Sequence, residues 1–125
     1  MALKPDILLV KKHDVKNFYF LSDLHIKNTT DQCYQNLLHF ISQVNPQDLL
    51  IFGGDIFHVF VGGSNFFENK FKDFFLELQN LHTDWFYLCG NHDFHHQDIV
   101  HKYGGKYFDQ PIILEITNKK IYIAH

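Results

Sequence analysis

The stretch LLIFGGD, residues 49–55, passes from four consecutive apolar residues into two glycines and an aspartate. A continuous apolar run of this length is typical of a strand that is buried on both faces. The glycines that follow let the backbone turn sharply. The same change from apolar run to metal-binding residue types occurs three more times, in FYFLSDLH (18–25), WFYLCGNHD (85–93) and IYIAH (121–125).

The pattern of apolar residues predicts strands at 7–10, 18–22, 49–52, 85–89, 111–117 and 120–124. We expect the first two to form a hairpin. Helical spacing predicts a helix over 31–44 and a short helix over 97–103. A further helix is expected after residue 64, with one apolar face made of Phe66, Phe67, Phe71, Phe74, Phe75, Leu78 and Leu81. Strands that alternate with helices predict a layered α/β domain.

The polar residues that follow the apolar runs are expected to share one site. Asp23, Asp55, Asn91 and His125 succeed one another at intervals of 32, 36 and 34 residues, about one strand–helix–strand unit each. In open α/β sheets the chemistry lies just beyond the carboxyl ends of the strands. With His25, which is two residues after Asp23, these side chains outline a metal site. Each motif alone is also consistent with an ordinary polar turn, but three such turns at consecutive strand ends favour the metal site.

The ligand types of this site are carboxylate, amide and imidazole, with no thiolate in the turns. Such a set suits Mn, with Fe or Zn as alternatives, rather than a structural thiolate zinc site. Two divalent cations about 3.5–4 Å apart form the usual clamp for hydrolysing phosphate esters. His92 could donate a proton or a hydrogen bond to a phosphate oxygen, and Asp93 could hold its imidazole in one tautomer.

The combination of Asp23-x-His25, Gly54-Asp55 and the GNHD motif at 90–93 resembles the calcineurin-like metallophosphoesterases. The resemblance implies the N-terminal part of a four-layer αββα sandwich. It also implies that Asp23, His25 and Asp55 hold one metal and that Asp55 bridges to a second, held with Asn91 and His125. The resemblance further implies that His92 and Asp93 are the catalytic residues. The implied reaction is in-line hydrolysis of a phosphoester or pyrophosphate.

A narrower likeness is carried by FLSDLHI (20–26), GDIFHVFVG (54–62) and KKIYIAH (119–125). These segments look like the UDP-2,3-diacylglucosamine diphosphatase branch. The likeness implies release of UMP and a lipid monophosphate in lipid A synthesis, with peripheral contact at the inner membrane. His92 stands where many members of that branch have Arg, and His58 stands at a position that is usually acidic. A generic phosphodiesterase or phosphatase, or an inactive fragment that binds metal or a partner, stays an alternative.

The family continues past the position of His125 and later supplies two more His ligands. We therefore expect residues 1–125 to be a single domain truncated on its C-terminal side, and inactive or nearly so alone. The net charge of −3 and the absence of any Arg or basic stripe argue against a nucleic-acid surface. Without a signal peptide or a long apolar segment, a cytoplasmic location is expected. The expected partner is a phosphorylated small molecule or lipid-nucleotide, and the oligomeric state is open.

Overall fold

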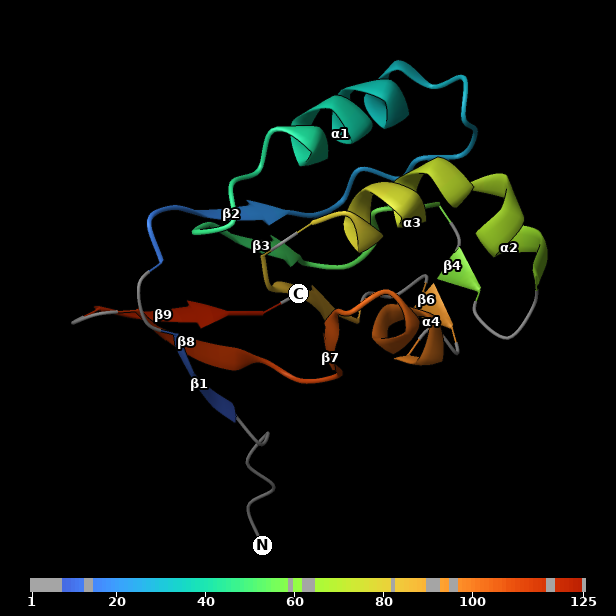
Figure 1. Cartoon of the computed structure of the whole chain (residues 1–125). Coiled ribbons are helices and arrows are strands. Elements are labelled where there is room, and N and C mark those ends of the chain that lie inside the picture. Colours follow the sequence, from blue (N-terminus) through green and yellow to red (C-terminus); the bar gives the residue numbers. More distant parts are fainter. Residues whose placement is uncertain are drawn as a thin grey trace, which may run out of the picture.

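The computed structural model describes residues 8–12, 15–58, 60–61, 65–81, 83–89, 93–94, 97–116 and 119–124 of the chain. Figure 1 shows the elements in chain order. They are β1 (Leu8–Lys12), β2 (Phe18–Leu21), α1 (Gln32–Ser42), β3 (Leu49–Phe52), β4 (Phe60–Val61), α2 (Asn65–Lys70), α3 (Lys72–Gln79), β5 (Trp85–Leu88), β6 (Asp93–Phe94), α4 (Gln97–Lys102), β7 (Lys106–Phe108), β8 (Ile112–Ile116) and β9 (Lys119–Ile123).

The central layer is a parallel sheet with the strand order β2-β3-β5-β7. Its two middle strands, β3 and β5, are buried at every position, as their continuous apolar sequences predict. Helical crossovers join β2 to β3 and β3 to β5, which is the connection that parallel neighbours need. The carboxyl ends of β2, β3 and β5 therefore lie along one edge of the sheet. Strand β7 was not predicted from the sequence.

The second sheet has the order β1-β8-β9, with β1 parallel to β8 and β8 antiparallel to β9. The expected hairpin between the first two strands is therefore wrong. β1 pairs with β8, in the register Leu8 to Ile112, whereas β2 pairs with β3 in the other sheet. The reason is burial: Val10 and Val15 pack against the apolar cluster between the sheets, and this overrides pairing between sequence neighbours.

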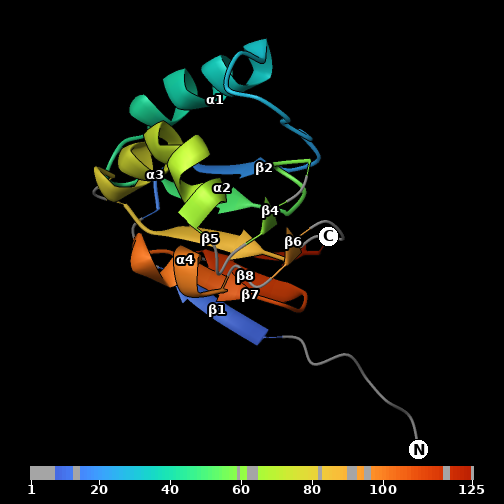
Figure 2. The same cartoon turned by 90° about the vertical axis from the view of Figure 1, so that its right-hand side faces the viewer.

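The parallel sheet is packed on both of its faces (Figure 2). Alternate residues of β3 and β5 point in opposite directions, as in any strand. Leu50, Phe52, Trp85 and Tyr87 join the helix-side cluster, while Leu49, Ile51, Phe86 and Leu88 join the cluster between the two sheets. The described residues thus form a helix layer, a parallel sheet and a mixed sheet. This arrangement confirms the predicted fold class and agrees with an N-terminal part of the four-layer sandwich.

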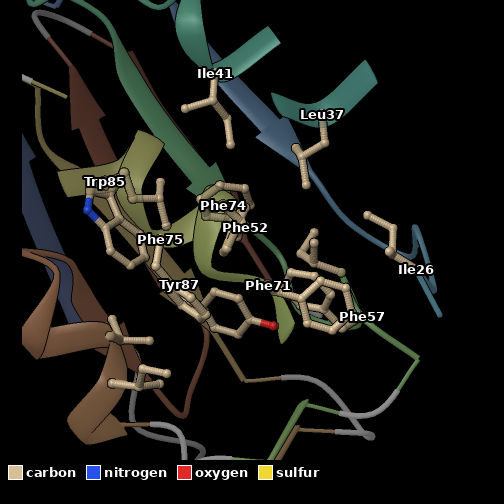
Figure 3. Packing of buried hydrophobic residues seen from close by; sticks show 14 of the residues in the cluster. Ile26, Leu37, Ile41, Phe52, Phe57, Phe71, Phe74, Phe75, Trp85 and Tyr87 are labelled. Atoms are coloured by element: carbon tan, nitrogen blue, oxygen red, sulfur yellow. The ribbon is translucent and has the colours of Figure 1, made fainter. Parts of the chain in front are cut away.

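The helix expected after residue 64 is divided into α2 and α3 at Phe71, whose backbone leaves the helical region at φ −109° and ψ 35°. Phe67 and Phe71 pack against Phe57, with ring centroids 5.0 and 4.4 Å away. Figure 3 shows Phe71 beside Phe57. Phe66, expected on the apolar face, is instead 77% exposed. Among the described residues, no helix combines the length and apolarity that crossing a membrane requires.

Candidate metal centre

Three predicted ligands converge where β2 and β3 end. Asp23, His25 and Asp55 each offer one ligand atom, and these atoms all lie within 4.8 Å of one another. His25 Nε2 is 4.0 Å from Asp23 Oδ1. The structure therefore brings these three residues together, and their role as metal ligands stays a prediction. They come together because β2 and β3 are parallel neighbours, so the residues that follow them leave the sheet at the same edge.

The three side chains differ in their exposure to water. The side chains of His25 and Asp23 are 43% and 63% exposed, whereas Asp55 is 3% exposed. Two carboxylates held this close repel each other, and a cation between them relieves that repulsion. Two carboxylate oxygens and an imidazole nitrogen are the donors that Mn, Fe and Zn accept in proteins. The donor set thus fits a divalent metal. The buried Asp55 would be its ligand on the protein side, and the exposed Asp23 and His25 would be its ligands on the solvent side.

All three candidate ligands have an unusual backbone conformation. Asp23, His25 and Asp55 have φ angles of 56°, 49° and 53°, and they are the positive-φ residues other than glycine in the described part of the chain. Left-handed backbone is unfavourable for residues with a Cβ, although Asp and His adopt it more readily than most. Such outliers persist only where the surrounding structure enforces them, and they concentrate at functional sites. The sequence alone gave no indication of this strain.

A ladder of main-chain hydrogen bonds joins the segment after β2, residues 23–26, to the segment after β3, residues 54–58. These bonds enforce the left-handed backbone of the three candidate ligands. The amides of Asp23 and His25 donate to the carbonyls of Gly54 and Asp55 at 3.2 and 3.0 Å. The ladder continues with the amide of Ile26, which donates to the carbonyl of Ile56 at 2.9 Å. The amide of His58 donates to the carbonyl of Ile26 at 2.8 Å. The isolated bridge between Ile26 and Phe57 is part of the same pairing. The relative position of the ligands is therefore fixed by the backbone.

The loop after His25 is held by two residues that were not singled out from the sequence. Lys70 of α2 donates from Nζ to the carbonyl of Lys27 at 2.9 Å and to Asn28 Oδ1 at 3.4 Å. Asp31 Oδ2 accepts the amides of Lys27 and Asn28 at 2.9 and 3.0 Å. The amides of Asn28 and then Lys27 lower the pKa of the Asp31 carboxyl. No sequence signal marks Lys70, because it is distant from this loop along the chain.

The other predicted site residues are not tested by the structure. Asn91, His92 and His125 lie outside the described residues, and for Asp93 the backbone alone is described, as the first residue of β6. β5 ends at Leu88 beside β3, so its carboxyl end lies at the edge of the sheet that holds Asp55. The assignments of Asn91 and His125 as ligands, and of His92 and Asp93 as catalytic residues, stay predictions.

Fold and cluster together define an α/β sandwich with a candidate metal centre at the carboxyl ends of parallel strands. The sequence model of the family described as calcineurin-like phosphoesterase matches residues 16–125 of this chain. The chain therefore belongs to the calcineurin-like phosphoesterases. This family supports hydrolase activity that depends on divalent metals, which agrees with the carboxylate and imidazole cluster.

Curated relatives provide a more specific similarity. Proteins named UDP-2,3-diacylglucosamine hydrolase from the Dugway, Henzerling II and Nine Mile phase I strains of Coxiella burnetii are 26% identical to the chain over 116 residues. The match covers 89% of this chain and 47% of each relative, so the chain spans about half the length of the curated relatives it matches.

A solved structure resembles the fold. The crystal structure of a protein of unknown function from Aquifex aeolicus aligns with a TM-score of 0.56 at 20% sequence identity. The alignment covers 86% of this chain and 59% of that chain. At this level of identity, the likeness concerns the fold alone.

Proposed function

We propose that this chain supplies the N-terminal ligands of a binuclear metal-dependent hydrolase that cleaves a phosphoester or pyrophosphate. One observation carries the proposal: Asp23, His25 and Asp55 converge within 4.8 Å at adjacent strand ends, in a chain that matches the calcineurin-like phosphoesterases. The order of these residues along the chain also agrees with the motifs of the family. Mn is the proposed metal, with Fe or Zn as alternatives.

Each residue has a distinct role in the proposed reaction. Asp23, His25 and Asp55 would hold one divalent cation, and Asp55, Asn91 and His125 would hold the second. A bound divalent cation supplies Lewis acidity toward a phosphoryl oxygen and lowers the pKa of water. His92 gives a proton to the leaving oxygen or a hydrogen bond to the phosphoryl group. Asp93 keeps the imidazole of His92 in the tautomer that this role requires.

The proposed substrate is UDP-2,3-diacylglucosamine, which is cleaved to UMP and a lipid monophosphate in lipid A synthesis. The name of the Coxiella burnetii relatives, UDP-2,3-diacylglucosamine hydrolase, supports this choice. The choice implies a cytoplasmic protein with peripheral contact at the inner membrane. A generic phosphodiesterase or phosphatase is the second candidate. It is favoured by His92, which stands where many members of the diphosphatase branch have Arg.

We propose further that residues 1–125 belong to one domain and supply only part of its ligand set. The chain covers 47% of each curated relative, so part of the ligand set that the family resemblance implies would lie outside it. Loss of ligands weakens metal affinity steeply. The 125-residue chain is therefore expected to bind metal weakly and to hydrolyse substrate slowly or not at all.

The metal site is tested by isothermal titration of the 125-residue chain with Mn²⁺. Asp55 and Asp48 make a matched pair, because both are 3% exposed and they lie beyond opposite ends of β3. Asp48 Oδ1 accepts a hydrogen bond from Asn17, and Asp48 Oδ2 accepts one from the amide of Asn45. Asp55→Asn should abolish Mn²⁺ binding, whereas Asp48→Asn should lower stability and leave the affinity unchanged. Equal affinities for Asp55→Asn and the wild type would refute the site.

The substrate is tested by comparing the rates at which the 125-residue chain hydrolyses two substrates in the presence of Mn²⁺. A radiolabelled assay measures release of UMP from UDP-2,3-diacylglucosamine, and a colorimetric assay follows bis(4-nitrophenyl) phosphate. The Coxiella burnetii hydrolase serves as the positive control. Preference for the lipid-nucleotide supports the diphosphatase assignment, and preference for the generic diester supports the second candidate. A rate equal to that of the control would contradict the expected inactivity of the chain alone.

A further inference from the structure

Gly53, which follows β3 and precedes Asp55 by two residues, lies against the end of β2. Its amide donates to the carbonyl of Leu21 at 2.6 Å. A Cβ built at Gly53 would stand 2.4 Å from Phe20 Cζ and 2.9 Å from Ser22 Cβ. Both distances are shorter than packed carbon atoms tolerate, since optimal contacts are about 3.5–4.0 Å. The turn that leads to Asp55 therefore fits against the end of β2 because residue 53 has no side chain.

The two neighbours of Gly53 would respond differently to an added methyl group. Phe20 is 41% exposed, and the nearest atom is at the far end of its ring, so the ring can swing away. The Cβ of Ser22 is attached directly to the main chain and moves only if the backbone moves. Ser22 immediately precedes Asp23, whose amide is hydrogen-bonded to the carbonyl of Gly54. Crowding at residue 53 is thus transmitted to the spacing between Asp23 and Asp55.

Backbone conformation does not explain the need for glycine at this position. Among the described glycines, Gly54 and Gly104 have positive φ angles of 93° and 87°. The φ angle of Gly53 is not in this left-handed range. An alanine at residue 53 is therefore compatible with the local backbone. The close approach to Ser22 remains as the reason why a side chain is unfavourable here.

We propose that Gly53 is a positioning residue of the metal centre: its missing side chain allows the Asp55 turn to lie against Ser22, which sets Asp23 at ligand distance from Asp55. The inference rests on the proposed metal site. It concerns affinity rather than the identity of the ligands, because Gly53 itself holds no cation. Residues that orient metal ligands typically change metal affinity by roughly 10–100-fold when mutated.

The test is a set of Mn²⁺ titrations on the 125-residue chain. Gly53→Ala should bind Mn²⁺ roughly 10-fold or more weakly than the wild type. Gly105→Ala is the control for crowding, because a Cβ there would meet the Trp85 ring at 2.6 Å, beside β7 rather than at the ligand turns. Gly105→Ala should lower the urea midpoint and leave the affinity for Mn²⁺ unchanged.

A second substitution identifies the contact that matters. The double variant Gly53→Ala/Ser22→Gly removes the Cβ that the new methyl group meets, so it should recover most of the lost affinity relative to Ser22→Gly alone. Gly53→Ala/Phe20→Leu should recover little. Wild-type affinity in Gly53→Ala, equal weakening in Gly105→Ala, or no rescue by Ser22→Gly would each overturn the positioning role. Absence of Mn²⁺ binding to the wild-type chain would instead overturn the metal site itself.

Discussion

His25 and Asp55 are joined through the main chain, since the His25 amide donates a hydrogen bond to the Asp55 carbonyl at 3.0 Å. Both residues are candidate ligands, so this bond sets the spacing between ligands before any cation binds. A site that is formed in advance loses less conformational freedom on binding. The strain of the left-handed backbone at these residues is compensated within the fold, by the ladder and by the packing beneath it.

The strain at Asp23 gives the first prediction. At φ 56°, alanine carries the full penalty of left-handed backbone, whereas glycine does not. The metal-free Asp23→Gly chain should therefore be more stable than Asp23→Ala by about 1 kcal/mol, even though glycine gains more entropy on unfolding. Urea unfolding in the presence of a chelator measures the difference.

Gln35, an exposed residue of α1, provides the control for this comparison. In helical backbone the order of the two substitutions is expected to reverse, with Gln35→Gly less stable than Gln35→Ala by about 1 kcal/mol. If Asp23→Gly is no more stable than Asp23→Ala, the backbone at Asp23 is not strained as described.

The second prediction concerns Phe57, which connects the metal centre to the core. Phe57 is fully buried, its backbone forms the bridge to Ile26, and its ring contacts Phe67 and Phe71. Figure 3 shows the Phe57 and Phe71 rings side by side. Truncation of a buried aromatic ring costs about 3–5 kcal/mol, so Phe57→Ala should lower the free energy of unfolding by that amount. Phe66→Ala removes the same ring from a site that is 77% exposed and should change stability by less than about 0.5 kcal/mol. Similar losses in the two variants would contradict the packing.

Much of this site could be predicted because parallel strands impose a simple rule. The apolar run at 49–52 predicts a strand that is buried on both faces, and the run at 85–89 predicts another strand. β3 at 49–52 and β5 at 85–88 confirm both. Once β2 and β3 are parallel neighbours, the residues that follow them must meet at one edge. That rule alone places Asp23, His25 and Asp55 together, and their ligand atoms do converge within 4.8 Å.

The features that could not be predicted depend on contacts between distant segments. The pairing of β1 with β8 joins residues about a hundred positions apart, and its gain is burial between two sheets that local sequence does not reveal. At the break, Phe71 packs against Phe57, which lies between β3 and β4 and is distant along the chain. The closeness of Gly53 to Ser22 depends on three-dimensional packing, since a sequence shows that a residue is glycine but not what lies beside it.

The third prediction concerns acid stability. Lys102 Nζ and the Tyr103 hydroxyl donate to Glu68 Oε2 at 2.7 and 2.8 Å, which joins α2 to α4. The hydrogen bond from Lys102, followed by that from Tyr103, lowers the pKa of Glu68. A lowered folded-state pKa means that this link stabilises the protein above the unfolded value of about 4.3 and is lost as pH falls through the lower folded-state value.

Urea midpoints of the wild type and Glu68→Gln, measured between about pH 6 and pH 3, test this link. The wild type should be the more stable at the upper end, and the difference should shrink toward the acid end. Lys102→Met removes the hydrogen bond that contributes most to the lowered pKa of Glu68. It should therefore also reduce the loss of stability between about pH 6 and pH 3. Parallel profiles for all three proteins would show that Glu68 does not carry the effect.

The last prediction concerns the edge where the two sheets meet. β2 and β9 are the end strands of their sheets in the described part of the chain, and they line a cavity of about 290 Å³ with Phe18, Phe20 and residues 121–124. Phe18, Phe20 and Tyr122 are 36%, 41% and 60% exposed. Unpaired strand edges that carry exposed apolar side chains favour association. We therefore expect the chain to self-associate at micromolar concentration, as measured by sedimentation velocity.

Phe18→Thr/Tyr122→Thr should shift the chain toward monomer, because threonine keeps the strand propensity and removes the apolar surface. Leu76→Thr is the matched control, since Leu76 is 46% exposed but lies on α3, away from this edge. It should leave the sedimentation profile unchanged. Equal effects of the two changes would mean that general surface hydrophobicity, rather than the β2–β9 edge, drives association. A wild-type chain that stays monomeric throughout would mean that the twist and charge of the edge, including Lys119 and Lys120 on β9, already prevent pairing.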